Sequence, residues 1–256
     1  MIASLAMYDR TEVQPSNDRL WALIRNGIRA VGLKAPETLT RGPAAYWPAW
    51  QSPDLILSQT CGFPYRARLH SHVTLIGTPD YGLEGCPPGY YRSIFVARQT
   101  DPRQTLAEFD NAALAFSEDL SQSGWAAPQN HARSLGLTLR PMLRSGSHIM
   151  AARAVAEGQA DIAAIDALTW SMIQEWEPYA GALKPIAATD PTPGLPYAAA
   201  PGADAARLFP IVAEAIANLP LQDRRILRLN GFVQIPAAAY LAVVTPPSPA
   251  ELGLPE

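Results

Sequence analysis

Residues 145–166, SGSHIMAARAVAEGQADIAAID, decide the fold of this chain. They begin with a turn of serine, glycine and histidine, and the segment 146–157 that follows predicts a helix. The apolar run at 161–165 predicts a buried strand, and another predicted strand ends near Met142, just before the turn. Strand, turn, helix and strand in this order are typical of a mainly parallel sheet with helices on its faces.

The same alternation of strands and helices extends over most of the 256 residues. Apolar runs predict further strands at 2–7, 54–57, 73–77, 93–97, 111–116, 138–142, 183–188, 232–235 and 240–244. Further helices are predicted from Ser16 or Asn17, after Gly62, and at 123–135, 168–176, 203–218 and 221–229. We therefore expect an α/β protein of two lobes, each a mainly parallel sheet flanked by helices.

The two lobes are expected to be joined by two hinge strands. Both ends of the chain form the first lobe in this prediction, residues 1–95 plus 199–256, and residues 96–198 form an inserted second lobe. The crossings then lie near 92–98 and 194–200. Two lobes joined in this way move about a hinge and take a ligand between them.

Composition excludes several classes of protein. The chain is 48% hydrophobic and 17% charged, which is too apolar for a disordered protein. Its net charge is −3 and it shows no basic run, so no nucleic-acid partner is expected. No apolar run reaches the roughly 18–20 residues of a membrane span.

The sequence leaves the compartment of the protein open. Met1–Tyr8 passes directly into Asp9 and Arg10 without a basic segment or a cleavage site. We therefore expect a periplasmic protein if a leader is missing from this sequence, and a cytoplasmic one otherwise. Cys61 and Cys86 form either one disulfide or two buried free thiols.

Three turns rich in hydroxyl groups lie between a predicted strand and a predicted helix: 58–62, 121–124 and 145–148. The unpaired N–H groups at the start of a helix attract anions, glycine allows close approach, and serine hydroxyls add donors. Serine is equally common as an ordinary N-cap residue. The pattern by itself therefore leaves both an anion site and plain helix capping open.

Five segments carry a resemblance to a known family: SQTCGFPY (58–65), GYYRSIFVAR (89–98), SQSGW (121–125), residues 145–166, and TPGLPYAA (192–199). Together they resemble the phosphate-, phosphite- and phosphonate-binding proteins of ABC importers, within the type II periplasmic binding protein superfamily. The resemblance extends from Tyr8 to about Val244. It implies two α/β lobes that close on a small ligand. Phosphonate-binding members often have threonine where this chain has Gln122.

The resemblance also implies which residues bind the ligand. Ser121, Ser123 and the N–H of Gly124 would hold an oxyanion, with a further donor from His148. Asp166 would face the ligand from the end of its strand. The remaining members of the implied set come from the other lobe or lie before the crossing strand: Tyr8, Ser58, Gln59, Thr60, Tyr90 and Tyr91.

We therefore expect a solute-binding protein for a small oxyanion-bearing ligand such as phosphate or a phosphonate. Its partners would be that ligand and, if the protein is exported, an ABC permease; it would act as a monomer. No catalytic residue, metal or cofactor is expected. The alternatives are a cytoplasmic enzyme, with His148 and Asp166 as acid and base, or a cytoplasmic ligand sensor. Arg92 either pairs with an acid near the hinge or points at the ligand.

Overall fold

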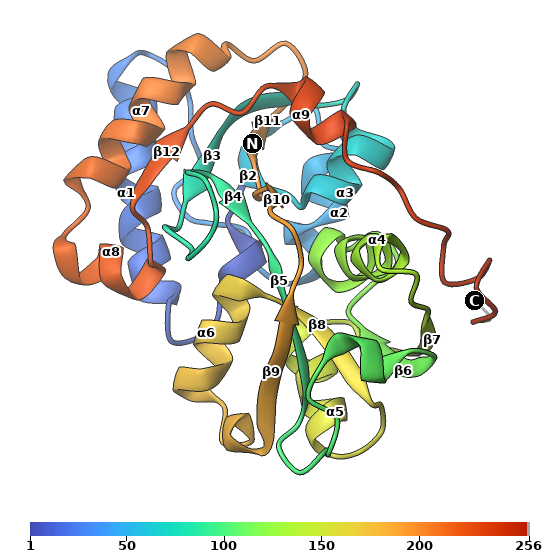
Figure 1. Ribbon diagram of the computed structural model, residues 1–256. Helices are drawn as coiled ribbons and strands as arrows, with labels where there is room; N and C mark the ends of the chain where they lie inside the picture. The colour runs from blue at the N-terminus through green and yellow to red at the C-terminus, as the bar shows by residue number, and fades with distance from the viewer. Residues whose placement is uncertain (255–256) are drawn as a thin grey trace. The chain divides into compact units, whose positions relative to one another are not determined.

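Two five-stranded sheets organise the protein, one in each of two units of the chain (Figure 1). The computed structural model describes residues 1–254. Unit 1 comprises Met1–Tyr90 and Pro193–Leu241, and unit 2 comprises Tyr91–Thr192 and the chain from Ala242 on. Within residues 1–254, no helix has the length and apolar character that a membrane crossing requires.

Unit 1 has strands in the order β1-β2-β11-β3-β12. The strands are β1 (Ile2–Ser4), β2 (Leu55–Gln59), β3 (Thr74–Asp80), β11 (Tyr197–Ala199) and β12 (Gly231–Val233). The helices are α1 (Gln14–Ala30), α2 (Trp47–Trp50), α3 (Gly62–Pro64), α7 (Ala205–Asn218), α8 (Leu221–Leu227) and α9 (Ala237–Leu241). β1 pairs parallel with β2, whereas β11 pairs antiparallel with both β2 and β3.

Unit 2 has strands in the order β7-β6-β8-β5-β9. The strands are β5 (Ser93–Arg98), β6 (Ala112–Phe116), β7 (Leu139–Arg144), β8 (Ile162–Asp166) and β9 (Leu183–Ala188). The helices are α4 (Ala127–Ser134), α5 (His148–Ala156) and α6 (Ala167–Trp176). β6 pairs parallel with β7 and β8, and β5 pairs antiparallel with β8 and β9. Outside both sheets, β4 (Tyr90–Tyr91) pairs with β10 (Thr192–Pro193).

The helices cover the sheets with faces that the sequence pattern anticipates. In α1 the buried residues Leu20, Ile24 and Ile28 recur every four positions, and α1 lies beside α7 in unit 1 (Figure 1). In α5 the buried face is made of small residues, including Ala151 and Ala152, which belong to one core cluster with Ala163 of β8. The α/β architecture with helices flanking both sheets is as the sequence predicts. The unit-1 sheet is mixed rather than mainly parallel, because β11 and β12 run antiparallel to their neighbours.

Two predicted elements are wrong. α1 begins at Gln14 rather than behind a cap at Ser16 or Asn17, and the Ser16 hydroxyl instead donates to Asp223 at 2.7 Å. Residues 240–244 were expected as a strand, but Tyr240 belongs to helix α9. Three alanines after a proline favour a first helical turn, and Tyr240 is buried with its hydroxyl 2.6 Å from the Thr78 hydroxyl.

The C-terminal stretch belongs to unit 2, whereas the sequence placed all of 199–256 in the first lobe. The indole N–H of Trp125 donates to the Pro247 carbonyl at 3.2 Å. The side-chain amide of Asn130 donates to the Val244 carbonyl at 2.7 Å. These two hydrogen bonds hold the last part of the chain against the helical segment that ends in α4 (Figure 1).

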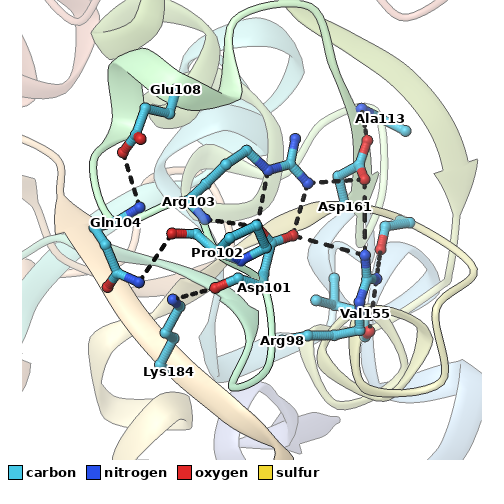
Figure 2. Close-up of polar contacts among 11 residues, drawn as sticks. Arg98, Asp101, Pro102, Arg103, Gln104, Glu108, Ala113, Val155, Asp161 and Lys184 are labelled. Carbon is cyan, nitrogen blue, oxygen red and sulfur yellow. Dashed lines mark hydrogen bonds and ion pairs between the residues drawn. The ribbon is translucent and has the colours of Figure 1, made fainter.

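A charged network ties the start and end of several unit-2 strands together (Figure 2). The guanidinium of Arg103 donates to both carboxylate oxygens of Asp101, at 2.9 and 2.7 Å, and to Asp161 at 3.1 Å. Asp161 also accepts the backbone N–H of Ala113 at 2.9 Å. Hydrogen bonds from Arg103 lower the pKa of the buried Asp101 to about 2.

We expect Asp101→Asn to lower the free energy of unfolding by about 2 kcal/mol at pH 7, because a pKa near 2 in the folded state lies below the unfolded value of about 3.9. The contribution of Asp101 is full above about pH 4 and is lost as the pH falls toward 2. Urea unfolding at pH 7 and pH 3 measures both effects. Asp190→Asn is the control, because the Asp190 side chain is 92% exposed. Equal unfolding midpoints for the two variants at pH 7 would contradict the assignment.

Candidate functional site

One edge of the unit-2 sheet collects the polar turns that the sequence singles out. β6, β7 and β8 are parallel, so the residues that follow them lie at the same edge. β5 runs the other way, so its first residue lies there too, with Ser93 opposite Asp166. We call this region the unit-2 edge; it consists of Arg92, Ser93, residues 117–124, residues 144–148 and Asp166.

The turn at 121–124 is held by its own hydroxyls. Ser121 Oγ accepts the backbone N–H of Gly124 at 2.9 Å and so caps the helical segment that starts at Gln122. The Ser93 hydroxyl donates to the backbone carbonyl of Ser123 at 2.8 Å. Ser123 is only 4% exposed, and its Oγ lies 2.8 Å from His148 Nε2. This arrangement places the first turn of a helical segment at the unit-2 edge.

The second turn is attached to the end of β6. The backbone N–H of Ser145 donates to the Phe116 carbonyl and that of Gly146 to the Ser117 carbonyl, both at 2.8 Å. Ser147 Oγ then accepts the backbone N–H of Met150 at 3.2 Å and caps α5. Because His148 is the first residue of α5, these contacts bring its ring to Ser123.

His148 is neutral at physiological pH. Burial lowers the pKa of its imidazole to about 4. A neutral imidazole carries one N–H and one acceptor nitrogen, so it adds a directional hydrogen bond to Ser123 without adding charge.

Asp166 serves as a helix cap at this edge. It is 2% exposed, and its Oδ1 accepts the backbone N–H groups of Leu168 at 2.8 Å and Thr169 at 3.0 Å. A carboxylate in this position stabilises the N-terminus of α6. Contact of Asp166 with a ligand, which the resemblance implies, stays a prediction.

Ser117 is a residue of the edge that the sequence analysis missed. Its hydroxyl is buried and has no hydrogen-bond partner within residues 1–254. A Cβ atom at Gly124 would lie 2.3 Å from Ser117 Oγ and 3.0 Å from Ser121 Oγ, so the glycine allows the two serines to close around it. Its place one residue after the buried strand β6 is the signal that would have found it.

The corresponding edge of unit 1 carries aromatic groups. Tyr8 follows β1 and Tyr81 follows β3, and their rings meet edge to face with centroids 5.3 Å apart. The amide Nε2 of Gln59, the last residue of β2, donates to the Tyr81 hydroxyl at 3.0 Å. The sequence analysis also missed Tyr81, because the strand predicted at 73–77 extends in the structure to Asp80, directly before this tyrosine. Tyr8, Gln59 and Tyr81 therefore form one group.

The other unit-1 residues of the implied set are engaged inside the unit. Ser58 is fully buried, with its Oγ 2.6 Å from Ser4 Oγ and 3.1 Å from the indole nitrogen of Trp50. Thr60 is fully buried as well, and its backbone N–H donates to the Pro196 carbonyl at 3.0 Å.

The two tyrosines before the crossing strand form β4, in which Tyr91 is buried and Tyr90 half-buried.

No disulfide joins Cys61 and Cys86 in this structure; Cys61 is buried and Cys86 is half-buried.

We expect Gly124→Ala to destabilise the protein by about 1–3 kcal/mol, because the added methyl group meets Ser117 and Ser121. Thermal unfolding measures the loss. Gly181→Ala is the matched control in unit 2, since a Cβ there meets nothing within 4 Å. Removing the nearest obstacle in Ser117→Ala/Gly124→Ala should recover part of the stability. A double variant no more stable than Gly124→Ala alone would refute this account of the turn.

We expect the His148 ring to stay neutral from pH 8 down to about pH 5, because its pKa is about 4. Above about pH 6.5 the shift has no effect on stability, but between 6.5 and 4 the unfolded chain binds a proton that the folded chain does not, so stability falls as the pH falls. An NMR titration, with the resonance assigned by its loss in His148→Asn, measures the pKa. A midpoint near 6.5 would contradict burial of the ring.

Comparison with known proteins identifies the family to which the chain belongs. Residues 57–240 match the family described as ABC transporter, phosphonate, periplasmic substrate-binding protein. No curated protein matches the sequence. A Xanthomonas citri protein bound to chloride ion has a similar structure, with a TM-score of 0.73, 15% identity, and coverage of 98% of this chain and 96% of the other.

Two structures of phosphonate-binding proteins are also similar. PhnD1 from Prochlorococcus marinus in complex with methylphosphonate has a TM-score of 0.69 at 18% identity, and the match covers 93% of this chain and 94% of that one. A binding-protein component of a Pseudomonas aeruginosa ABC phosphonate transporter has a TM-score of 0.65 at 14% identity, with 91% and 80% covered. At these identities the likeness shows the fold, which is the type II periplasmic binding protein fold expected from the sequence. With the match over residues 57–240, the chain belongs to the family of phosphonate ABC-transporter periplasmic substrate-binding proteins, and its role is that of a solute-binding protein.

Proposed function

We propose that this protein binds a small tetrahedral oxyanion, of the phosphate or phosphonate class, at the unit-2 edge. The observation that carries the proposal is Ser123, which lies in the first turn of a helical segment and whose hydroxyl is 2.8 Å from the neutral His148 ring. A helix N-terminus and aligned hydroxyl groups favour an anion. Each hydrogen bond to a charged oxygen is about twice as strong as one between neutral groups.

His148 has a defined part in this proposal. When its Nε2 carries the proton, the ring donates to Ser123 Oγ, and the hydroxyl hydrogen of Ser123 is left to donate to an oxygen of the ligand. The neutral ring therefore orients a donor in the serine turn. Ser121 takes part through the cap that it provides for Gly124.

The unit-1 group is proposed as a second set of ligand contacts. Tyr8 and Gln59, with the added Tyr81, present aromatic and amide groups at the carboxyl ends of β1, β2 and β3. Ser58 is assigned a structural part instead, because its hydroxyl is shared with Ser4 and Trp50 in the interior.

The partners follow from the family. Its members serve ABC importers in the periplasm, which implies a small ligand and a permease. We propose that the mature protein acts there as a monomer and delivers its ligand to a cognate permease. The enzyme alternative gains no support from its two candidate residues, because the lowered pKa of His148 makes it a poor base and Asp166 caps α6.

We expect at least one of phosphate, phosphite, methylphosphonate, 2-aminoethylphosphonate and sulfate to bind in isothermal titration calorimetry and to raise Tm. Ser123→Ala should weaken that binding roughly 10- to 100-fold, the value of a hydrogen bond to a charged group. Ser134→Ala is the control, since this exposed hydroxyl at the end of α4 bonds the His131 carbonyl. A panel in which no probe binds, or equal affinities for both variants, would reject the proposed site.

A further inference from the structure

Arg92 is a half-buried cation without a partner. Within residues 1–254, three arginine side chains have no hydrogen bond, ion pair or aromatic contact: Arg92, Arg133 and Arg225. Arg133 and Arg225 are exposed, so water solvates them, whereas Arg92 is half-buried. Removing a guanidinium from water is costly unless an anion or acceptor replaces the lost hydration.

The position of Arg92 is at the unit-2 edge. Its backbone carbonyl accepts the N–H of Ala167 at 3.0 Å, directly after Asp166. The next residue, Ser93, donates its hydroxyl to the Ser123 carbonyl at 2.8 Å. Arg92 is therefore one residue away from the serine that holds the proposed anion-binding turn.

The remaining charges at this edge are already engaged or have the wrong sign. The guanidinium of Arg144 donates to both carboxylate oxygens of Asp119, at 2.6 and 2.9 Å. His148 is neutral above its pKa of about 4. Glu118 and Asp166 are acids, and burial raises the pKa of Glu118. Among the described residues of the edge, Arg92 is thus the cation that remains for an incoming anion.

Asp190 is the nearest alternative partner by strand register. The N–H of Thr189 donates to the Ser93 carbonyl at 2.9 Å, so continuing the antiparallel register of β5 and β9 past the ends of the strands sets Asp190 opposite Arg92. The Asp190 carboxylate is nevertheless 92% exposed, and one of its oxygens lies 3.9 Å from His131 Nδ1. The structure contains no ion pair between Arg92 and Asp190.

We propose that Arg92 is a ligand-binding residue that supplies the positive charge for the oxyanion at the unit-2 edge. This inference rests on the proposed function and adds to it the residue that balances the charge of the ligand. The planar guanidinium suits two oxygens of a tetrahedral anion, which a lysine at the same position would match less well. Serine donors then orient the ligand while Arg92 balances its charge.

The test compares arginine variants by calorimetry with inorganic phosphate and methylphosphonate as probes. Arg92→Gln should weaken binding roughly 10- to 100-fold, and Arg92→Lys, which keeps the charge but loses the planar fork, should bind with intermediate affinity. Raising the NaCl concentration should weaken binding by the wild type more than by Arg92→Gln. Arg133→Gln is the matched control, because it removes another unpartnered arginine of unit 2, and it should bind as the wild type does.

The outcomes separate this inference from the proposed function. If the wild type binds a probe and Arg92→Gln binds it as tightly as Arg133→Gln, the role of Arg92 is overturned and the proposed function stands. If the wild type binds neither probe, both fail. If the purpose of Arg92 is an ion pair with Asp190, then Arg92→Gln and Asp190→Asn lower Tm equally while affinity is unchanged, which also overturns the inference. If Arg92→Gln does not fold, the affinity of Arg92→Lys for the probe is compared with that of Arg133→Gln instead.

Discussion

The antiparallel pairing of β5 with β8, which sets Ser93 opposite Asp166, is the constraint on which the unit-2 edge depends. β6, β7 and β8 alone would gather their following turns by parallel pairing. The reversed β5 adds the start of a strand to the same edge, and the Ser93 hydroxyl then holds the carbonyl of Ser123 at 2.8 Å. One register thus joins a cation, a serine turn and a helix cap that are far apart in the sequence.

In the proposed function, this edge recognises anions with few formal charges of its own. Burial lowers the pKa of His148 and keeps its ring neutral, and the serines contribute dipoles rather than ions. Neutral donors are cheaper to bury than charged ones, so they remain in place when no ligand is bound. Neutral donors discriminate poorly between ligands of different net charge. In our proposal, the unpaired Arg92 supplies that discrimination.

Sequence patterns predicted most of the elements because buried apolar runs and helical spacing mark them directly. They also singled out the turns that carry Ser121, Ser123 and His148. In the structure the Ser123 hydroxyl is within hydrogen-bond distance of His148, and the Ser121 hydroxyl caps the same turn by accepting the N–H of Gly124. Contacts between distant segments were beyond them: nothing local in the sequence reveals that Ser16 bonds Asp223 or that Tyr240 bonds Thr78. Ser58 shows the same limit, because a strand-end serine looks alike whether it faces solvent or the interior.

The arginines of unit 2 show that the same type of side chain can either stabilise the fold or remain available for a ligand. Arg103 is matched by Asp101 and Asp161 in a network that joins strands, and the paired charges stabilise the fold (Figure 2). Arg92 directly precedes β5, at the opposite end of that strand from Arg103, and has no such match among the described residues. Because a half-buried guanidinium without a partner is costly, we infer that the partner of Arg92 comes from outside the chain. Arg103 therefore stabilises the sheet through its ion pairs, whereas Arg92 is proposed to bind a ligand.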